Sequence, residues 1–393
     1  MILRKLDKEE HQKTRALWEE IFQEDTEEFL NYYYYIKTRE NDIYVVEEDG
    51  GICSMLHLNP YRVMIEGEEA PSAYIIAVST RKPYRSRGYM GALLSTSLND
   101  MYGQKVPFTF LMPAAEAIYT PYDFRFIYDQ DIGVTGRPEA AEGKCVCADA
   151  SLWQAGEIAD FFNEHYGRAW QVRTVRDHEY YQTMIMEQQS ERGGVRLMKE
   201  DGRLCGVYAY AAEGTLEIRE PLFLPGYEEE FLRSVGELAA SVRTDGRLPG
   251  EQRESGSAEE IKIYACPDVI PCISREKKPL IMARIVCLPE LLKMMTVSEE
   301  EEVDCSFAVI DPLIRQNSRV WRITSRKGET RLHVQETEDS EGVLPVAELT
   351  EILFGCLTPR DIKDRENVMM TERLEEELAK ITKLTRVFLN EIV

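Results

Sequence analysis

Four cations and a glycine lie close together in an otherwise acidic chain, within the stretch VSTRKPYRSRGYMGALL at residues 78–94. The cations are Arg81, Lys82, Arg85 and Arg87. Gly88 follows them and an apolar helical pattern begins after it. The first amides of a helix lack internal acceptors and its dipole is positive there, so this position favours an anion. Glycine also lets a phosphate approach the backbone closely. Residues 85–91, RSRGYMG, therefore predict a pyrophosphate-binding loop, with an ordinary basic β–α turn as the alternative.

Strands must precede this loop and a helix must follow it. The extended segments DIYVVEEDG, GICSMLHLNPYRV, YRVMIEGEEA and AYIIAVST come before it, and Asp49-Gly50 predicts a hairpin turn between the first two. GYMGALLSTSLNDMYGQK predicts the helix, and FTFLMP a short buried strand after it. Residues 7–38 predict helix, and we interpret the four tyrosines at 32–35 as helix packing with some exposed hydroxyls rather than as an aromatic binding wall.

A second unit begins near Ala148. SLWQAGEIADFFNEHYG predicts a helix, and KEDGRLCGVYAY repeats the hairpin turn and following strand of EEDGGICSMLHL, which indicates a weak internal repeat. The copy lacks an R-x-x-G segment after its later strand, so we expect no anion site there. Residues 244–260 predict a polar surface loop.

A third unit of mixed helices and strands starts near Met282. Four of its apolar residues are interpreted as core rather than as a ligand wall: Trp321, Ile323, Phe307 and Val309. The chain ends LTRVFLNEIV, and an ending that stays apolar predicts a terminus packed into the protein.

The composition limits the class of partner. Seventy Asp and Glu against forty-seven Lys and Arg give the 393 residues a net charge of −23. Such a surface repels nucleic acid and attracts cationic small molecules such as polyamines and aminosugars. The start has no apolar h-region and no apolar run reaches the roughly 18 residues of a membrane span, so we expect a cytoplasmic protein without a membrane partner. Nine scattered cysteines without C-x-x-C spacing and five scattered histidines predict reduced thiols and no metal site.

The strand–R-x-x-G–helix unit resembles motif A of the GNAT acetyltransferases, which usually reads Q/R-x-x-G-x-G/A. Residues 85–90 read RSRGYM, so Met90 takes the small-residue position and Gly91 comes one later. The segment AEAIYTPYDFRF at 115–126 resembles the I-Y-x-x-F-G-[YF] segment of the Eis-type branch, the "enhanced intracellular survival" group of aminoglycoside acetyltransferases. Asp123 stands where that segment has glycine.

The order of the units also resembles that branch. It implies an α+β (mixed α/β) fold class with tandem GNAT folds and a C-terminal sterol-carrier-protein-like domain. The implied domains are a catalytic GNAT domain at 1–147, a degenerate second GNAT-like domain at 148–281, and a sterol-carrier-like domain at 282–393 whose C-terminus reaches the active site. Relatives of this kind are often multimers, so a homo-oligomer is implied as well.

The resemblance implies an N-acetyltransferase in which a primary amine of a cationic small molecule, aminoglycoside-like or polyamine, attacks acetyl-CoA directly in a ternary complex. The pantetheine amides would pair with residues 78–80 as an added strand, and a backbone N–H near Val78 would polarise the thioester carbonyl. The implied cofactor-binding residues are Val78, Ser79, Thr80, Arg85, Ser86, Arg87, Gly88, Tyr89, Met90, Gly91, Ala114 and Ala115. Direct attack requires no protein nucleophile, which suits a chain without a Cys-His or Ser-His constellation.

Two proton transfers remain in this scheme. By resemblance Tyr119 protonates the leaving thiolate, and a phenol with a pKa of about 10 suits a thiol of about 8.5; the alternative is a core tyrosine with a satisfied hydroxyl. The implied base is the terminal carboxylate of Val393, whose weak basicity burial would increase. The alternative is a packed terminus with its carboxylate in solvent, and Glu116 and Glu391 are the fallback bases.

Other functions stay open at this point. A GNAT enzyme could act instead on a lysine side chain or a peptide N-terminus. The C-terminal unit could carry an apolar ligand, because a fold does not fix a function. The departures at Met90 and Asp123 also leave an inactive CoA-binding sensor. CoA binding without turnover would favour the sensor, whereas lipid binding without CoA binding would favour the carrier.

Overall fold

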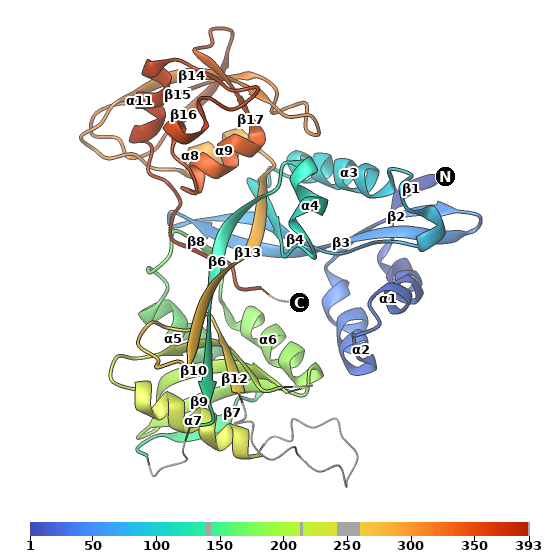
Figure 1. The fold of residues 1–393 in the computed structure, drawn as a ribbon, viewed down its shortest axis with the longest axis vertical. Helices are drawn as coiled ribbons and strands as arrows, with labels where there is room; N and C mark the ends of the chain where they lie inside the picture. Colours follow the sequence, from blue (N-terminus) through green and yellow to red (C-terminus); the bar gives the residue numbers. More distant parts are fainter. Residues whose placement is uncertain (139–142, 213–214, 242–259, 392–393) are drawn as a thin grey trace.

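The computed structural model describes residues 1–138, 143–212, 215–241 and 260–391. Figure 1 shows three lobes, with the N-terminal lobe in blue, the central lobe in green and yellow, and the C-terminal lobe in orange and red. Each lobe contains both helices and strands, which confirms the predicted α+β class. Two long strands, β6 (Arg125–Gly136) and β13 (Ser274–Ile285), pair antiparallel and run from the upper lobes to the lower one.

The N-terminal lobe is a sheet covered by helices on both faces. Its strands, in spatial order, are β1 (Ile2–Lys5), β2 (Asp42–Glu48), β3 (Gly51–Ile65), β4 (Glu68–Thr80) and β5 (Phe108–Leu111). Its helices and 3-10 turns are η1 (Lys8–Thr14), α1 (Arg15–Ile21), α2 (Glu27–Tyr35), η2 (Lys37–Arg39), η3 (Lys82–Tyr84), α3 (Tyr89–Gly103), α4 (Glu116–Tyr119) and η4 (Thr120–Tyr122). Leu93, Leu94 and Leu98 of α3 pack on one face of the sheet, and Trp18 and Tyr33 of α1 and α2 pack on the other. The tyrosine run is core as interpreted, because its first three members are buried and only the fourth is exposed.

The β3–β4 hairpin is longer than the predicted segments. Both strands run unbroken to a turn at Glu66-Gly67, where the two φ angles are +47° and +82°. Pro60 and Pro71 do not interrupt them, because β2 pairs with β3 only as far as Leu58 and β5 pairs with β4 only at Tyr74. At these two positions no neighbouring strand needs the N–H that proline lacks.

The central lobe repeats this hairpin-and-helix arrangement. Its strands are β7 (Val146–Asp149), β8 (Val172–Thr174), β9 (Gly194–Glu200), β10 (Arg203–Ala211), β11 (Glu217–Phe223) and β12 (Glu260–Tyr264). Its helices are η5 (Leu152–Gln154), α5 (Ala155–His165), α6 (His178–Ser190) and α7 (Glu228–Ser241). The φ angles of Asp201 and Gly202, +49° and +81°, match the +54° and +80° of Asp49 and Gly50, which confirms the predicted repeat of the turn. The predicted polar loop at 244–260 lies outside the described residues except for its last position, Glu260, which begins β12.

The C-terminal lobe has a five-stranded sheet of its own. Its strands are β14 (Val303–Ile310), β15 (Val320–Ser325), β16 (His333–Thr337), β17 (Gly342–Pro345) and β18 (Met369–Met370). Its helices are α8 (Leu288–Met294), α9 (Val346–Leu353), α10 (Pro359–Ile362) and α11 (Glu372–Lys380). The four residues predicted as core, Trp321, Ile323, Phe307 and Val309, are all buried in one apolar cluster, which confirms that interpretation.

Strands cross both predicted domain boundaries. Positions 147 and 148 lie within β7, and positions 281 and 282 lie within β13. Strand β13 pairs with both β5 and β6, and β6 pairs with β12, so the N-terminal and central strands form one continuous fourteen-stranded sheet among the described residues. The division into three domains stays a prediction.

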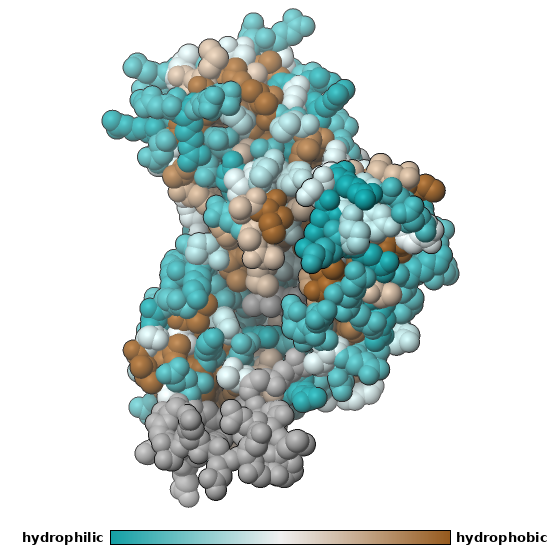
Figure 2. All heavy atoms as spheres, turned by 45° about the vertical axis from the view of Figure 1, so that its right-hand side comes forward, coloured by the Kyte–Doolittle hydropathy of each residue, from teal (hydrophilic) through white to brown (hydrophobic). Residues whose placement is uncertain are grey.

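The last segment of the chain leaves the C-terminal lobe and returns to the middle of the molecule (Figure 1). Strand β19 (Val387–Phe388) pairs in parallel with β8, and Leu389, Asn390 and Glu391 are buried after it. This confirms the predicted packing of the ending as far as Glu391, whereas Val393 lies outside the described residues. Figure 2 shows apolar side chains gathered in the hollow between the lobes and hydrophilic side chains over most of the outer surface on this face.

No helix among the described residues is long and apolar enough to cross a membrane. The same residues contain no group of three or more His, Cys, Asp or Glu side chains placed to hold a metal ion.

Candidate active site

Strands β4 and β5 separate just before the residues predicted to hold the cofactor. Their parallel pairing is limited to Tyr74 opposite Phe110. Strand β4 then bulges, because its register with β3 shifts and Ala77 adopts a φ of +55°. A bulge leaves backbone groups unpaired in the ladder. The segment from Val78 to Thr80 therefore lies beyond the last pair between β4 and β5, and this unpaired edge is called the β4–β5 opening below.

The loop after β4 enters α3 through two residues with left-handed backbone. Ser86 has a φ of +62°, and Gly88, the N-cap of α3, has a φ of +79°. That conformation costs a non-glycine residue roughly 1–2 kcal/mol, so glycine suits position 88. The amides of Tyr89, Met90 and Gly91 belong to the first turn and have no intrahelical acceptors. The predicted anion-binding amides thus lie at the positive end of a 15-residue helix.

The four cations of the loop are not equivalent. Arg81 forms a 3.0 Å ion pair with Glu20 of α1, on the far side of the sheet from α3. Arg87 lies 3.6 Å from Glu48 and is otherwise exposed. The exposed Arg85 donates from Nε to a backbone carbonyl of its own loop at 3.1 Å. Arg85 and Arg87 therefore remain beside the α3 N-terminus, whereas the charge of Arg81 is directed elsewhere.

Both departures from the family pattern fit the local backbone. Gly91 is the position where a small residue matters, because a Cβ built there would lie 3.0 Å from the hydroxyl of Tyr122. Asp123 adopts a φ of +66°, which glycine adopts without steric cost. Its carboxylate lies 3.5 Å from the fully buried guanidinium of Arg284, and burial raises the pKa of this carboxyl. The turn that the family builds with glycine is thus kept with aspartate.

Tyr119 ends helix α4, which follows the exposed residues Ala114 and Ala115. Its side chain is 8% exposed and packs edge-on against Phe124, with ring centroids 5.9 Å apart. It shares an apolar cluster with Ile75 of β4, on the α3 side of the sheet. Burial raises the pKa of its phenol to about 12. Tyr119 therefore keeps its proton at neutral pH.

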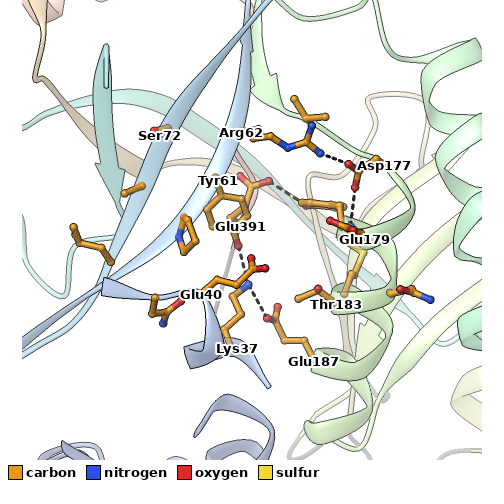
Figure 3. A pocket seen from close by; sticks show the side chains of 18 of the residues that line it. Lys37, Glu40, Tyr61, Arg62, Ser72, Asp177, Glu179, Thr183, Glu187 and Glu391 are labelled. Carbon is orange, nitrogen blue, oxygen red and sulfur yellow. Dashed lines mark hydrogen bonds and ion pairs between the residues drawn. The ribbon is translucent and has the colours of Figure 1, made fainter. Parts of the chain in front are cut away.

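A pocket of about 630 Å³ opens where the N-terminal lobe, helix α6 and the C-terminal segment meet (Figure 3). Among its described lining residues are seven carboxylates: Glu40, Asp42, Asp177, Glu179, Glu187, Glu220 and Glu391. The cations among them are Lys37, Arg39, Arg62 and Arg219. Arg62 is paired with Asp177, and Lys37 lies 3.7 Å from Glu187. The pocket is therefore net acidic, in contrast to the basic loop at α3.

Helix α6 supplies two of these carboxylates, Glu179 and Glu187, and the sequence alone did not predict its role. Glu179, Thr183 and Glu187 point toward the pocket from successive turns (Figure 3). Glu187 is 8% exposed and accepts a 3.2 Å hydrogen bond from the hydroxyl of Tyr32. Burial raises the pKa of the Glu187 carboxyl. The polar i, i+4 spacing in HEYYQTMIMEQQ was the available signal, but a solvated helix face has the same pattern.

The C-terminal segment brings Glu391 to the same pocket. Its Oε1 accepts hydrogen bonds from Thr174 at 2.6 Å and from the hydroxyl of Tyr180 at 3.1 Å, and lies 3.6 Å from Arg176. Its Oε2 is buried and has no hydrogen-bond partner among the described residues. The other fallback base, Glu116, is exposed on α4. Of the two fallback bases, only Glu391 is placed at the pocket.

Strand β4 connects the acidic pocket with the β4–β5 opening. Ser72 and Ala73 line the pocket, and Tyr74, next in the chain, is the residue that still pairs with β5. Burial raises the pKa of the Tyr74 phenol, and both Glu391 and Tyr119 add to this increase. Strand β4 therefore runs from the wall of the acidic pocket to the end of its pairing with β5, and the two parts of the candidate site are neighbours along this strand.

Two family models match the sequence. An acetyltransferase (GNAT) domain matches residues 3–127, and a sterol carrier protein domain matches residues 288–391. No curated protein matches the sequence significantly.

Several solved structures share the fold over the whole chain. A probable N-acyltransferase from Enterococcus faecalis has a TM-score of 0.82 at 18% identity and covers 100% of this chain and 99% of its own. A GCN5-related N-acetyltransferase from Anabaena variabilis has a TM-score of 0.77 at 14% identity, with 100% of both chains covered. Eis1 from Mycobacterium abscessus has a TM-score of 0.69 at 13% identity, also with 100% of both chains covered.

These likenesses confirm the predicted fold, including its Eis-type arrangement of units. GNAT acetyltransferases use acetyl-CoA as co-substrate. This chain therefore contains a GNAT acetyltransferase domain at residues 3–127 and a sterol carrier protein domain at residues 288–391, within a fold that it shares with the solved structures above.

Proposed function

We propose that this acetyltransferase acetylates a primary amine of a cationic small molecule, such as an aminoglycoside-like compound or a polyamine. The observation that carries the proposal is the acidic pocket beside the β4–β5 opening. Its carboxylates are in part buried, where charges interact more strongly than in water. They would attract an ammonium-bearing acceptor and hold one amine near the reacting carbonyl.

The chain's own residues fit acetyl-CoA on the other side of this site. The backbone of Val78, Ser79 and Thr80 lies beside the strand opening, where it can pair with pantetheine amides. The amides of residues 86–91, with Arg85 and Arg87, would hold the pyrophosphate. Bound acetyl-CoA supplies an activated acetyl thioester, and the Val78 amide is the proposed donor to its carbonyl oxygen.

Tyr119 is the proposed proton donor to the leaving thiolate. Its phenol, with a pKa of about 12, is fully protonated at neutral pH. A thiol has an ordinary pKa of about 8.5, so a phenol is already the weaker acid of the two, and burial widens the difference. Its contribution is therefore to hold a proton at the sulfur in a water-poor place and to stabilise developing negative charge there.

The proposed base is the α-carboxylate of Val393, with Glu391 as the alternative. Support comes from the segment that precedes Val393, because Leu389, Asn390 and Glu391 are buried and both Asn390 and Glu391 line the pocket. The buried, unpartnered Oε2 of Glu391 is an acceptor that an incoming amine can satisfy.

The test measures acetyl-CoA-dependent thiol release with aminoglycosides, polyamines, lysine and short peptides, on protein that carries no C-terminal tag. We expect release with a polycationic class and a KM that rises with salt, since screening weakens the attraction of the pocket. Glu187→Gln should raise this KM, whereas Glu164→Gln, at an exposed glutamate outside the pocket, should not.

The other functions predict different results. Release only with lysine or peptides would replace the small-molecule acceptor by a protein amine. Coenzyme A binding without release for any amine would favour a CoA-binding sensor. Lipid binding without coenzyme A binding would favour an apolar-ligand carrier.

A further inference from the structure

The central lobe contains a second opening built like the one between β4 and β5. In the N-terminal lobe, Ala77 and Val78 together lie opposite one residue of β3, and Ala77 has a φ of +55°. In the central lobe, Glu220 and Pro221 lie opposite one residue of β10, and Glu220 has a φ of +52°. The two bulges therefore occupy the same place in the two repeated hairpins.

The residues after the bulges confirm this correspondence. The amide of Arg81 donates to the carbonyl of Cys53 at 2.9 Å, and the amide of Leu224 donates to that of Cys205 at 2.9 Å. Strand β11 pairs in parallel with β12 only up to Arg219, immediately before its bulge. The two strands then separate, as β4 and β5 do.

The second opening has lost the groups that suit a coenzyme A thioester. Pro221 stands where the N-terminal lobe has Val78, and proline has no N–H to offer a carbonyl oxygen. Helix α7 begins four residues after Leu224, whereas α3 begins eight residues after Arg81, so the basic loop is absent. The first turn of α7 carries three glutamates at 228–230, which oppose a phosphate.

What remains is an apolar pocket of about 380 Å³. Its lining includes Tyr166, Trp170, Pro221, Leu222, Phe223 and Phe388. The rings of Trp170 and Phe388 stack with centroids 4.2 Å apart. No lysine or arginine is among the described residues that line it.

Two carboxylates at this pocket determine which ligand charge it can tolerate. Glu220 is 5% exposed, and its two oxygens are bonded to Arg176 and Asn390, so its charge is already compensated within the protein. Glu228 lines the pocket at the start of α7, and its carboxylate accepts hydrogen bonds from the backbone amides of Gly226 and of Glu228 itself. An anionic ligand would meet Glu228, whereas an uncharged apolar one would gain from leaving water.

We propose that this pocket binds an apolar small molecule without negative charge, through a cleft that no longer suits coenzyme A. Glu220 lines both this pocket and the acidic pocket, so the two are neighbours, but ligand binding here requires no acetyl transfer. The ligand lies against the stacked rings of Trp170 and Phe388.

The test uses two fluorescent probes that differ only by a sulfonate, N-phenyl-1-naphthylamine and 1-anilinonaphthalene-8-sulfonate. We expect saturable binding of the uncharged probe with quenching of Trp170 emission, and at least tenfold weaker binding of the anionic probe. Trp170→Phe should abolish the quenching component while the probe still binds. Acetyl-CoA should not displace the probe.

Two variants of one loop separate this pocket from other apolar surfaces. Val269 lines the pocket and is 62% exposed, and Ile273 is 69% exposed and does not line it, so both positions tolerate a charge without loss of core. Val269→Glu should weaken binding of the uncharged probe at least tenfold, and Ile273→Glu should leave it unchanged. Equal binding in both variants, displacement by acetyl-CoA, or no saturable binding would each overturn the proposal.

Discussion

At the scale of single residues, the proposed chemistry depends most on the Tyr119 hydroxyl. Its burial and its pKa of about 12 keep the proton in place throughout the physiological pH range. Removing that hydroxyl leaves the ring and its contact with Phe124 in place. We therefore expect Tyr119→Phe to lower kcat at least about a hundredfold, the usual contribution of general acid catalysis, with little change in melting temperature.

The matched control is Tyr35→Phe, at a tyrosine that is 59% exposed on α2. It should change neither kcat nor the melting temperature. An unchanged kcat in Tyr119→Phe would remove this residue as the acid, and a large drop in melting temperature would show that its hydroxyl has a structural role.

Glu187 is the second residue whose ionisation can be tested. Burial raises the pKa of its carboxyl, so the carboxylate is present above this raised pKa and is neutralised as pH falls through it. The KM for a cationic acceptor should therefore rise as the pH falls below the pKa of the Glu187 carboxyl. Glu187→Gln should have a KM about tenfold higher near neutral pH and should lose this acid-side dependence.

Glu164→Gln provides the comparison profile, because it removes the same charge outside the pocket. If the KM of the wild type and the KM of Glu187→Gln changed with pH in the same way, Glu187 would not be the group that attracts the cationic acceptor. Sequence reasoning reached Tyr119 but not Glu187. Tyr119 lies in a contiguous motif, whereas Glu187 becomes relevant only when α6 packs beside Lys37 and Tyr32, which are about 150 positions away in the chain.

At the scale of elements, the N-terminus of α3 has the backbone conformation on which the predicted anion-binding loop depends. Gly88 at its N-cap has a φ of +79°, and Gly103 at its last position has no positive φ. Neither glycine has another atom within 4 Å of an added Cβ. Gly88→Ala should therefore act through backbone strain of roughly 1–2 kcal/mol and raise the KM for acetyl-CoA about tenfold.

Gly103→Ala has the same added methyl without this strain, and its KM for acetyl-CoA should stay at the wild-type value. Similar acetyl-CoA KM values for the two variants would show that the left-handed N-cap does not position the binding loop. Isothermal titration with coenzyme A would report the same comparison without turnover.

Turns and strands that depend on a few adjacent residues could be predicted from the sequence. Those that depend on contacts with residues far away in the chain could not. The turns at Asp49-Gly50 and Asp201-Gly202 carry their positive φ angles in their own residue types. The unbroken β3 and β4 were not predicted, because Pro60 and Pro71 are tolerated only where neighbouring strands have ended. The apolar pocket of the central lobe likewise depends on Phe388 packing against Trp170, and these two residues are far apart in the sequence.

At the scale of the whole molecule, the C-terminal segment joins the three lobes. It leaves α11, pairs with β8 through β19, and carries Asn390 and Glu391 into the acidic pocket. Asn390 donates to Glu220 at 3.0 Å, and Glu391 accepts from Thr174 at 2.6 Å. The acceptor side of the site is thus assembled from parts of the chain that no local pattern connects.

This assembly predicts a specific sensitivity to additions after Val393. A short tag there would begin three residues beyond Glu391, which is 4% exposed and lines the acidic pocket, so the tag would start close to the pocket wall. It would also replace the α-carboxylate proposed as base by an amide. We expect turnover to be lost while coenzyme A binding is kept, because the α3 N-terminus and the β4–β5 opening lie in another part of the site. The same tag before Met1, which is 71% exposed, should leave turnover unchanged.

Full activity of the C-terminally tagged protein would rule out the terminal carboxylate as the base. Glu391 would then be the remaining candidate, and the kcat of Glu391→Gln would test it. Loss of coenzyme A binding along with turnover would instead show that the segment supports the fold of both halves of the site.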